Sequence, residues 1–499
     1  MIRLSQRWTA VALSGLVIVT VGSVGPEKPH TPVSATASGT VAASSAPSAA
    51  VRAATDATAA QPDRLKVVTR RPGLADGLLF VTPQTWNDKP RGPQIVDNEG
   101  RQVWFHRIPD GEFATNLRVQ TYQGKKVLTW WQGTTTDTGT GDGVGYIADE
   151  NYNVIATVRP PASDGTLGFH EFALTPRGTV LVVVHKTVPF DFTPFGGPVD
   201  GRAVDDVVTE IDVATGRTVA AWDSMEHVPA DETDFLPKNF TSPYDYLHVN
   251  SVSVDTDGNW LVSARYTSTV YKVDPRTGRI IWRLGGRTSD FRLGTGARFM
   301  WQHSVEPQGK GVYRIFDNAT HPPFTGYESR VAYIKADTEK RTATLVRRLT
   351  HPESESAPLE GGSQGLPNGD VLVSWGTGAR VTEFSPTGEV LFDATLPGVV
   401  SSYRAYRMEW KGRPDTDPEA TVDDGAVHAV WNGATGVHRW RVLAGAARED
   451  LARVTDARWN GYDTAVPLPE AARDSKYVQV QAVDVHGRVI GSSPVTATG

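Results

Sequence analysis

Three stretches of the chain share one frame, in which a short strand, a turn with glycine and an apolar strand follow each other. They read ALTPRGTVLVVV from Ala173, SVDTDGNWLVSA from Ser253 and GLPNGDVLVSW from Gly365. A second set, TEIDVATGRTVAAW, YKVDPRTGRIIWRL and TEFSPTGEVLFDA, predicts an outer hairpin around each Gly-containing turn. Repetition at irregular spacings of roughly 45 to 80 residues is typical of a β-propeller. We count six units and predict an all-β fold, a six-bladed β-propeller over residues 64–410.

The composition agrees with this fold and leaves room for a second domain. The 499 residues include 48 glycines, 33 prolines and 14 tryptophans, which favours short strands joined by tight turns. Beyond Trp410 the repeat stops, and VHAVWNGATGVHRWRVLAG and YVQVQAVDVHGRVIGSS alternate like the strands of a β-sandwich. We therefore predict an immunoglobulin- or fibronectin-like module over residues 415–499. The chain has no cysteine, which favours the fibronectin-like variant.

The N-terminal residues predict export. Arg3 and Arg7 precede an apolar run from Trp8 to about Val24, the layout of a secretory signal. Residues 1–25 are therefore a signal peptide or an N-terminal membrane anchor through residues 8–24, and both alternatives remain open. Residues 26–63 are mostly Ala, Ser, Thr and Pro, which predicts a flexible spacer. We expect a protein that is secreted or anchored to the outer face of the cell membrane.

Charge and motif content exclude several functions. A net charge of −6 without a basic stripe argues against a nucleic-acid partner. The absence of cysteine excludes thiolate catalysis and Cys-ligated metals. The sequence has neither a Gly-x-Ser-x-Gly elbow nor a Walker motif.

Polar side chains lie where several of the predicted units begin. His170, His248 and His303 occupy the same point of the frame in three units, and Asn250 and Arg265 lie near His248. Because the first strands of propeller units line one axis, we expect these side chains to converge. His248 and Asn250 would share one strand face, since strand side chains alternate with period two. Imidazoles, an amide and a guanidinium together predict an oxyanion site that contains a nucleophile or base.

Other interpretations of these residues remain open. Taken alone, His248 also fits a strand-end histidine bonded to backbone, and Arg265 also fits a charge that faces solvent. Three imidazoles could hold zinc, but a nearby arginine and the lack of carboxylates at corresponding positions favour an oxyanion. The run from Asp255 resembles the start of a calcium loop, yet Trp260 stands where that loop needs glycine. A hairpin turn at Asp257 fits better, and we expect neither a metal nor another cofactor.

The stretches HVNSVSVDTDGNWLVSAR, DPRTGRIIWRLGG, WQH and FDN resemble the bacterial arylsulfotransferase family. The resemblance implies a propeller with an axial pocket that moves a sulfuryl group from a phenolic sulfate ester to a phenol. His303 matches the family's nucleophilic histidine, which becomes transiently sulfated. His248, Asn250 and Arg265 match residues that would hold the sulfuryl oxygens, and His170 matches an earlier histidine. Either His248 or His170 would then serve as acid or base.

Two further hypotheses belong to different classes of protein. The first is a propeller without catalysis that binds a glycan or another anionic cell-surface ligand at the same mouth, and it would retain ligand without turnover. The second is a quinone-dependent dehydrogenase. The segments TGRTVAAW from Thr215 and TGRIIW from Thr277 resemble the tryptophan-docking repeats of such enzymes, which brace neighbouring blades and indicate the fold more than a cofactor. That enzyme would need an axial calcium and acidic ligands, which the sequence does not reveal.

Overall fold

The computed structural model describes residues 62–85, 89–136, 139–235, 243–320 and 328–498. The expected signal or anchor at 1–25 and nearly all of the expected spacer at 26–63 lie outside the described residues. Within them the secondary structure is almost entirely β-strand, which confirms the all-β prediction. The helical elements described are one turn each: α1 (Ser224–His227), η1 (Thr193–Phe195), η2 (Ala230–Glu232), η3 (Gly376–Gly378) and η4 (Glu470–Ala472). No helix in this part of the chain is long and apolar enough to span a bilayer.

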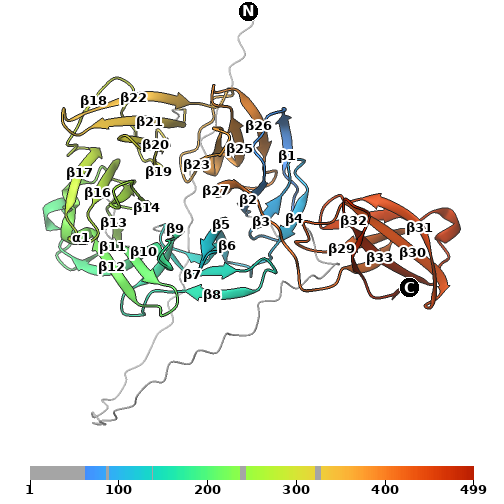
Figure 1. Cartoon of the computed structure of the whole chain (residues 1–499). Coiled ribbons are helices and arrows are strands. Elements are labelled where there is room, and N and C mark those ends of the chain that lie inside the picture. The colour runs from blue at the N-terminus through green and yellow to red at the C-terminus, as the bar shows by residue number, and fades with distance from the viewer. Residues whose placement is uncertain (1–61, 86–88, 137–138, 236–242, 321–327, 499) are drawn as a thin grey trace, which may run out of the picture. The chain divides into compact units, whose positions relative to one another are not determined.

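The described strands up to residue 408 form six sheets around a common centre (Figure 1). Written from the innermost strand outward, the first sheet contains β27 (Ser401–Met408), β2 (Leu78–Gln84), β3 (Gln94–Val96) and β4 (Gln102–Phe105). The second sheet contains β5 (Phe113–Tyr122), β6 (Lys125–Thr135), β7 (Gly141–Ala148) and β8 (Val154–Val158). The third sheet contains β9 (Thr166–Leu174), β10 (Thr179–Phe190), β11 (Gly201–Asp212) and β12 (Thr218–Asp223), with β13 (Tyr244–Asp245) parallel to β11. The fourth sheet contains β14 (Val249–Val254), β15 (Trp260–Ala264), β16 (Thr269–Val273) and β17 (Ile280–Gly285). The fifth sheet contains β19 (His303–Pro307), β20 (Val312–Asp317), β21 (Arg330–Asp337) and β22 (Thr342–Leu349), with β18 (Arg292–Leu293) parallel to β22. The sixth sheet contains β23 (Gly362–Gly365), β24 (Val371–Ser374), β25 (Arg380–Phe384), β26 (Val390–Thr395) and β1 (Lys66–Arg70).

Two strands exchange between the ends of this region and close the ring. β27, the last of its strands in the chain, is the innermost strand of the sheet that contains β2, β3 and β4, where Phe80 pairs with Tyr406. β1, the first strand, pairs with β26 at the outer edge of the sixth sheet. Each exchange covers a strand edge that would otherwise be open, so the two ends of the region hold each other in place.

The hydrophobic core lies between neighbouring sheets. Six clusters of buried side chains each combine residues from two adjacent sheets, so that every sheet up to residue 408 packs against both of its neighbours. One polar contact adds to this packing: Trp222 Nε1 donates to the carbonyl oxygen of Gly278 at 3.0 Å, from β12 to the turn of the next sheet. The tryptophan of the TGRTVAAW segment therefore braces two sheets, as its resemblance to tryptophan-docking repeats implied.

The chain beyond residue 410 forms two further sheets. They contain β28 (Glu419–Asp423), β29 (Ala426–Val430), β32 (Asp463–Pro467), and β31 (Asp450–Arg458), β30 (Arg439–Ala447), β33 (Tyr477–Val483), β34 (Val489–Ser492), β35 (Thr496–Ala497). Val427 and Val466 of the first sheet share a buried cluster with Trp440 and Val480 of the second. Both sheets thus contribute to one apolar core.

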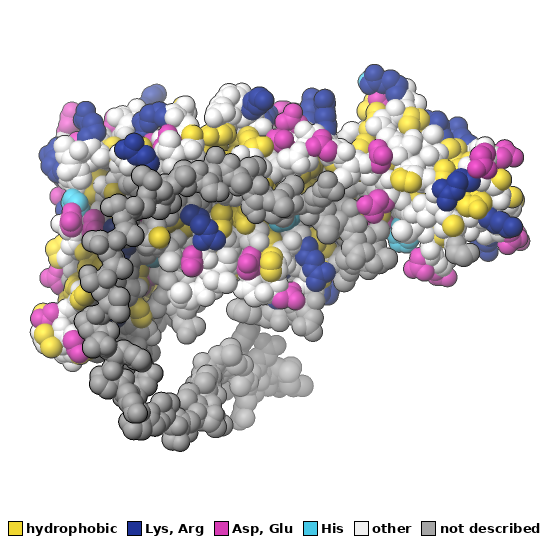
Figure 2. Space-filling model, turned by 90° about the horizontal axis from the view of Figure 1, so that it is seen from below, with side chains coloured by type: hydrophobic (Ala, Val, Ile, Leu, Met, Phe, Trp, Pro, Cys, Tyr) yellow, Lys and Arg dark blue, Asp and Glu magenta, His cyan; other side chains and the backbone are white. Residues whose placement is uncertain are grey.

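Charged side chains are interspersed on the face shown in Figure 2. Lysine and arginine alternate with aspartate and glutamate there, and no extended area of one sign is visible. The part of this face that the described residues leave visible therefore presents no basic track to a polyanion.

Candidate active site

The inner strands carry irregularities where the candidate residues lie. A β-bulge or register shift interrupts the pairing of β5, β9, β14, β19 and β27 with the next strand of each sheet. The irregular stretches contain, in that order, Asn116, His170, Asn250, Ser304 and Tyr403. Because a bulge turns a side chain away from the regular alternation, these strands can direct several polar groups toward the centre of the ring.

His303 is the first residue of β19 and is 3% exposed. Its Nδ1 atom lies 2.7 Å from Oδ1 of Asn318, whose Nδ2 donates to the carbonyl oxygens of Ala357 and Glu360 at 2.6 and 2.9 Å. Those two bonds orient the amide, so Oδ1 faces the imidazole and can only accept. His303 therefore carries its proton on Nδ1, and the lone pair on Nε2 is available for chemistry.

His248 is oriented by a carboxylate. Its Nδ1 lies 2.6 Å from Asp245 Oδ2, and its backbone N–H donates to Asp245 Oδ1 at 2.9 Å. The sequence predicted that His248 and Asn250 lie on one face of a regular strand, and the strand is not regular there. His248 has a left-handed φ of 56°, β14 begins only at Val249, and a bulge includes Asn250. The carboxylate that accepts from Nδ1 leaves Nε2 of His248 as the basic nitrogen.

The three predicted histidines come together around Tyr403. The ring centroids of His170 and His248 are 4.8 Å apart, and those of His170 and Tyr403 are 5.9 Å apart. The centroid of His303 is 6.4 Å from that of Tyr403. His170 lies within β9 rather than at its beginning, and its Nδ1 is buried without a hydrogen-bond partner among the described residues. The imidazoles contributed by three separate sheets therefore meet at one place.

Asn250 and Arg265 lie beside the histidines. Arg265 N donates to the carbonyl oxygen of His248 at 3.0 Å, and Asn250 Nδ2 donates to the carbonyl oxygen of Gln302 at 2.8 Å. The Arg265 guanidinium is 4% exposed and stacks over Trp301, 4.0 Å from the ring centroid. Asn250 Oδ1 and Arg265 Nε are buried and have no partner within the described structure. Because an unpaired buried polar atom costs about 1–3 kcal/mol, these atoms are suited to receive a polar ligand.

Several residues that the sequence did not predict complete the site. Tyr403 OH donates to the carbonyl oxygen of Asn250 at 3.1 Å, and Arg404 Nη2 donates to the same oxygen at 3.0 Å. Arg404 also pairs with Glu171 at 2.9 Å, which a second pair at 2.9 Å joins to Arg118. Burial opposes ionisation of Glu171, but Arg404 and Arg118 hold its pKa below the ordinary value. This buried network fixes the backbone of Asn250 from the closing strand β27.

The sequence showed no carboxylate at the frame positions that correspond to the histidines, and the carboxylates near the imidazoles come from other positions. Asp245 and Asp206 each accept from an imidazole and from a backbone N–H, and Glu171 binds two guanidinium groups. Asp245 lies on β13, Asp206 lies on β11 and Glu171 lies in the bulge of β9. None of these three residues occupies the frame position of a histidine. Among the described residues, no group of three or more His, Asp or Glu is arranged to hold a metal ion. Gln302, which precedes His303, donates its amide to Ser263, Ala264 and Thr269 and so supports the neighbouring sheet.

Both His303 and His170 are held in the neutral form. Burial lowers the pKa of each ring well below 6.5, and positive charge nearby adds to the effect, from Arg265 at His303 and from the other imidazoles at His170. A neutral imidazole is the form that can act as a nucleophile or base at neutral pH.

This neutrality predicts a loss of stability in acid. An unfolded histidine titrates near 6.5, so below that pH the unfolded chain binds more protons than the folded one. The stabilisation is complete above pH 6.5 and decreases as the pH falls, by at most about 1.4 kcal/mol per pH unit for each ring. Urea unfolding at about pH 7.5 and about pH 5.5 measures this, and His303→Asn should lose less stability than the wild type between these values. Equal losses in both proteins would contradict the assignment of neutral His303.

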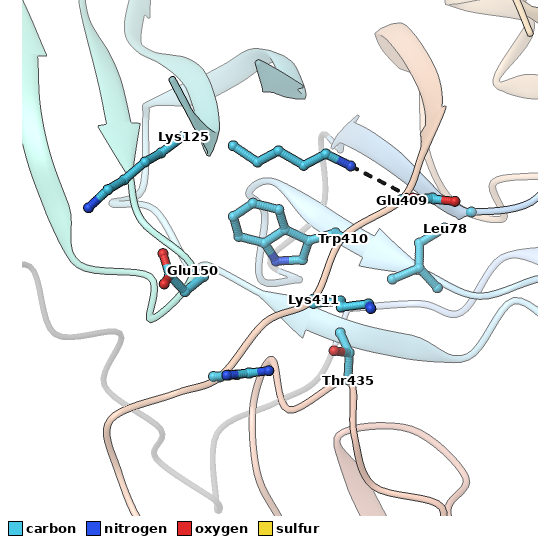
Figure 3. Close-up of a pocket in the computed structure, with 10 residues that line it drawn as sticks. Leu78, Lys125, Glu150, Glu409, Trp410, Lys411 and Thr435 are labelled. Atoms are coloured by element: carbon cyan, nitrogen blue, oxygen red, sulfur yellow. Dashed lines mark ion pairs between the residues drawn. The ribbon is translucent and has the colours of Figure 1, made fainter. Parts of the chain in front are cut away.

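A large surface pocket lies away from the imidazoles. It has a volume of about 1010 Å³ and is lined by Lys125, Glu150, Trp410, Lys411, Thr435 and neighbouring residues (Figure 3). An ion pair in this pocket joins Lys126 and Glu409 at 3.7 Å. Both side chains are exposed, so the pair contributes little to stability. The lining contains no imidazole, so we place the candidate site at the inner strands.

Comparison with known proteins gives one family and several distant structures. A model of the family described as Arylsulfotransferase (ASST) matches residues 118–396. No curated protein matches the chain significantly. A protein of unknown function from Bacteroides caccae is 11% identical with a TM-score of 0.41, over 66% of this chain and 98% of that one. A putative 6-phosphogluconolactonase from Bacteroides fragilis is 12% identical with a TM-score of 0.32, over 67% and 98% of the two chains. A catalytically inactive virginiamycin B lyase from Staphylococcus aureus, solved with quinupristin, is 9% identical with a TM-score of 0.32, over 73% and 96%.

Proposed function

The chain belongs to the arylsulfotransferase family, and from this premise we propose that it transfers a sulfuryl group from a phenolic sulfate ester to a phenol, with His303 as the carrier. The observation that supports this most is the tautomer of His303. Asn318 holds the proton on Nδ1, burial keeps the ring neutral, and Nε2 retains its lone pair. A nucleophile with this geometry needs no separate base to be activated.

In the first step, Nε2 of His303 attacks the sulfur of the donor ester. The bond between sulfur and the phenolic oxygen breaks, and the phenolate leaves, protonated where necessary by an acid. His248, with Asp245 behind it, supplies that proton, because His170 is held neutral and can act only as a base. Arg265 and the second N–H of Asn250 Nδ2, whose first N–H donates to Gln302, hold the sulfuryl oxygens, where negative charge is spread in the transition state. The product of this step is a sulfohistidine at His303.

In the second step, a phenol takes the place of the released product. A neutral imidazole of His248 or His170 accepts its proton, its oxygen attacks the sulfur, and the bond between sulfur and Nε2 of His303 breaks. The chain returns to its starting state and shows ping-pong kinetics. No metal or other cofactor takes part in this scheme.

We further propose how the domains serve this activity. The six sheets up to residue 408 correspond to six blades of a propeller, and the two later sheets to an immunoglobulin- or fibronectin-like sandwich. The six clusters between neighbouring sheets and the single core of the later sheets support these assignments. The apolar run at 8–24, with Arg3 and Arg7 before it, supports export, either as a secreted protein or with a membrane anchor.

The test uses 4-nitrophenyl sulfate as donor and phenol as acceptor. Without an acceptor, the purified protein should release a burst of nitrophenol equivalent to its own concentration and then slow down, because His303 remains sulfated. Addition of phenol should restore continuous release. Binding of the donor without any release would contradict the proposal and would favour the non-catalytic, anion-binding alternative.

A further inference from the structure

A second pairing of imidazole and carboxylate lies behind His170. His185 lies on β10 and is 6% exposed. Its Nδ1 lies 2.7 Å from Oδ1 of Asp206, a fully buried residue of β11. The other oxygen of Asp206 accepts from Val249 N at 2.8 Å, between His248 and Asn250. One carboxylate therefore orients His185 and also anchors the strand that carries two of the candidate residues.

The free nitrogens of His185 and His170 are both enclosed. The ring centroids are 5.9 Å apart at an interplanar angle of 80°. Nε2 of His185 and Nδ1 of His170 are buried atoms without a hydrogen-bond partner among the described residues. Space for the His185 ring exists because residue 168 is glycine, where an added Cβ would come within 2.3 Å of Nε2. Because Asp206 accepts at Nδ1, Nε2 of His185 is the atom that can take up a proton.

His170 itself is a poor place for a proton to remain. Burial and the nearby imidazoles and Arg404 lower the pKa of this ring well below 6.5. The groups that face His185 are His170 from β9, Asp206 from β11 and Asp245 from β13. Of the carboxylates near the imidazoles, Asp245 is bonded to His248 and Glu171 to two arginines. Asp206 is thus the carboxylate that can stabilise a charged His185.

We propose that His185 and Asp206 form a proton-holding pair that acts through His170 when the acceptor phenol attacks. This inference rests on the proposed function. The phenol O–H bond breaks and its proton passes to Nε2 of His170, while the proton on Nδ1 of His170 passes to Nε2 of His185. The two nitrogens share no hydrogen bond in this structure, so the second transfer requires one ring to turn toward the other. The phenolic oxygen forms its bond to sulfur as the bond from sulfur to His303 breaks. His185 becomes an imidazolium beside the Asp206 carboxylate and later returns the proton by the reverse route. His185 is therefore a positioning residue that does not touch the substrate.

The test separates the two half-reactions. In His185→Asn, the amide nitrogen can still donate to Asp206, but no atom can take up a proton. We expect the nitrophenol burst to keep its amplitude and rate, because nitrophenolate is a good leaving group. Transfer from sulfated enzyme to phenol, whose pKa is about 10, should slow by about 100-fold, the lower end of the range for general base catalysis. The loss should shrink for more acidic chlorophenols and disappear when the acceptor is already a phenolate.

Two further variants keep the inference falsifiable. Asp206→Asn, whose amide oxygen can still accept from Val249 N, should show the same selective loss if His185→Asn does not fold. His351→Asn is the matched control, because His351 is also buried and its Nε2 lies 3.3 Å from Asp393 in another sheet, away from the site. Equal losses in the burst and in the transfer step, or a loss independent of the acceptor's pKa, would assign His185 a structural role and overturn the inference. A wild type without any burst would overturn the proposed function, and this inference with it.

Discussion

Replacement of His303 by alanine is expected to lower nitrophenol release from 4-nitrophenyl sulfate by on the order of 10⁴-fold or more, because the reaction loses its nucleophile. No other described side chain at the site has the same arrangement, an imidazole whose Nδ1 proton is fixed by an oriented amide. Initial rates measure the loss. Mass spectrometry measures a second consequence, since the peptide that contains residue 303 should gain one sulfuryl group in the wild type and none in the variant.

His351→Ala is the control for the removal of a buried imidazole. His351 is 4% exposed and lies in the connection between β22 and β23, where it contacts Arg380 and Asp393. This variant should keep the wild-type burst even if it is less stable. Undiminished release by His303→Ala, or sulfation of a different residue in the wild type, would contradict the assignment of the nucleophile.

Replacement of Arg265 by alanine is expected to lower kcat by about 10²- to 10³-fold, the range measured when one preorganised donor to a developing anion is removed. The guanidinium is enclosed, stacks on Trp301 and has its Nε free of protein partners among the described residues. Arg265→Lys should recover only part of the loss. A lysine keeps the charge but cannot reproduce the planar stack or offer two parallel donors. The burst rate at saturating donor measures the effect on sulfuryl transfer directly.

Arg347→Lys provides the matched control for this substitution. Arg347, on the outer part of the fifth sheet, also stacks on an aromatic ring, 5.3 Å from the centroid of Tyr333, and donates to one backbone carbonyl oxygen. The Arg347→Lys substitution should leave kcat and KM unchanged. If Arg265→Ala raised only KM and left kcat intact, Arg265 would bind the donor's ground state and would not stabilise the transition state.

Much of the fold could be predicted from local patterns. The turns at Gly178, Gly258 and Gly369 stand in the same place between two strands, as the shared frame indicated. The predicted hairpin turn after Asp255 is also present, since Asp255 N donates to the carbonyl oxygen of Asn259 and Gly258 N to that of Asp255. Such features depend on residues close in sequence, which is why they are visible without a structure.

The candidate site was only partly accessible in this way. His170, His248, His303, Asn250 and Arg265 were found because the frame marks them, and the structure brings them together at the inner strands. Asp245 and Asn318 had a weak signal, as polar residues close to a predicted strand. Tyr403 and Arg404 had none, because β27 belongs to the C-terminal end of the region and fills the inner position of a sheet whose other strands come from the N-terminal end. Their roles at the site depend on that exchange.

Turn residues, strand alternation and family motifs are local properties, so they identify an all-β protein of the arylsulfotransferase family without a structure. Tertiary structure alone decided which atoms can react. The tautomer of His303 and the pairing of His185 with Asp206 arise from contacts between consecutive strands, and the neutral state of His170 arises from groups far apart in the chain. All of them depend on enclosure in one water-poor centre. In such a place the cost of burying a charge and the direction of single hydrogen bonds control protonation, and neither can be read from neighbours in sequence.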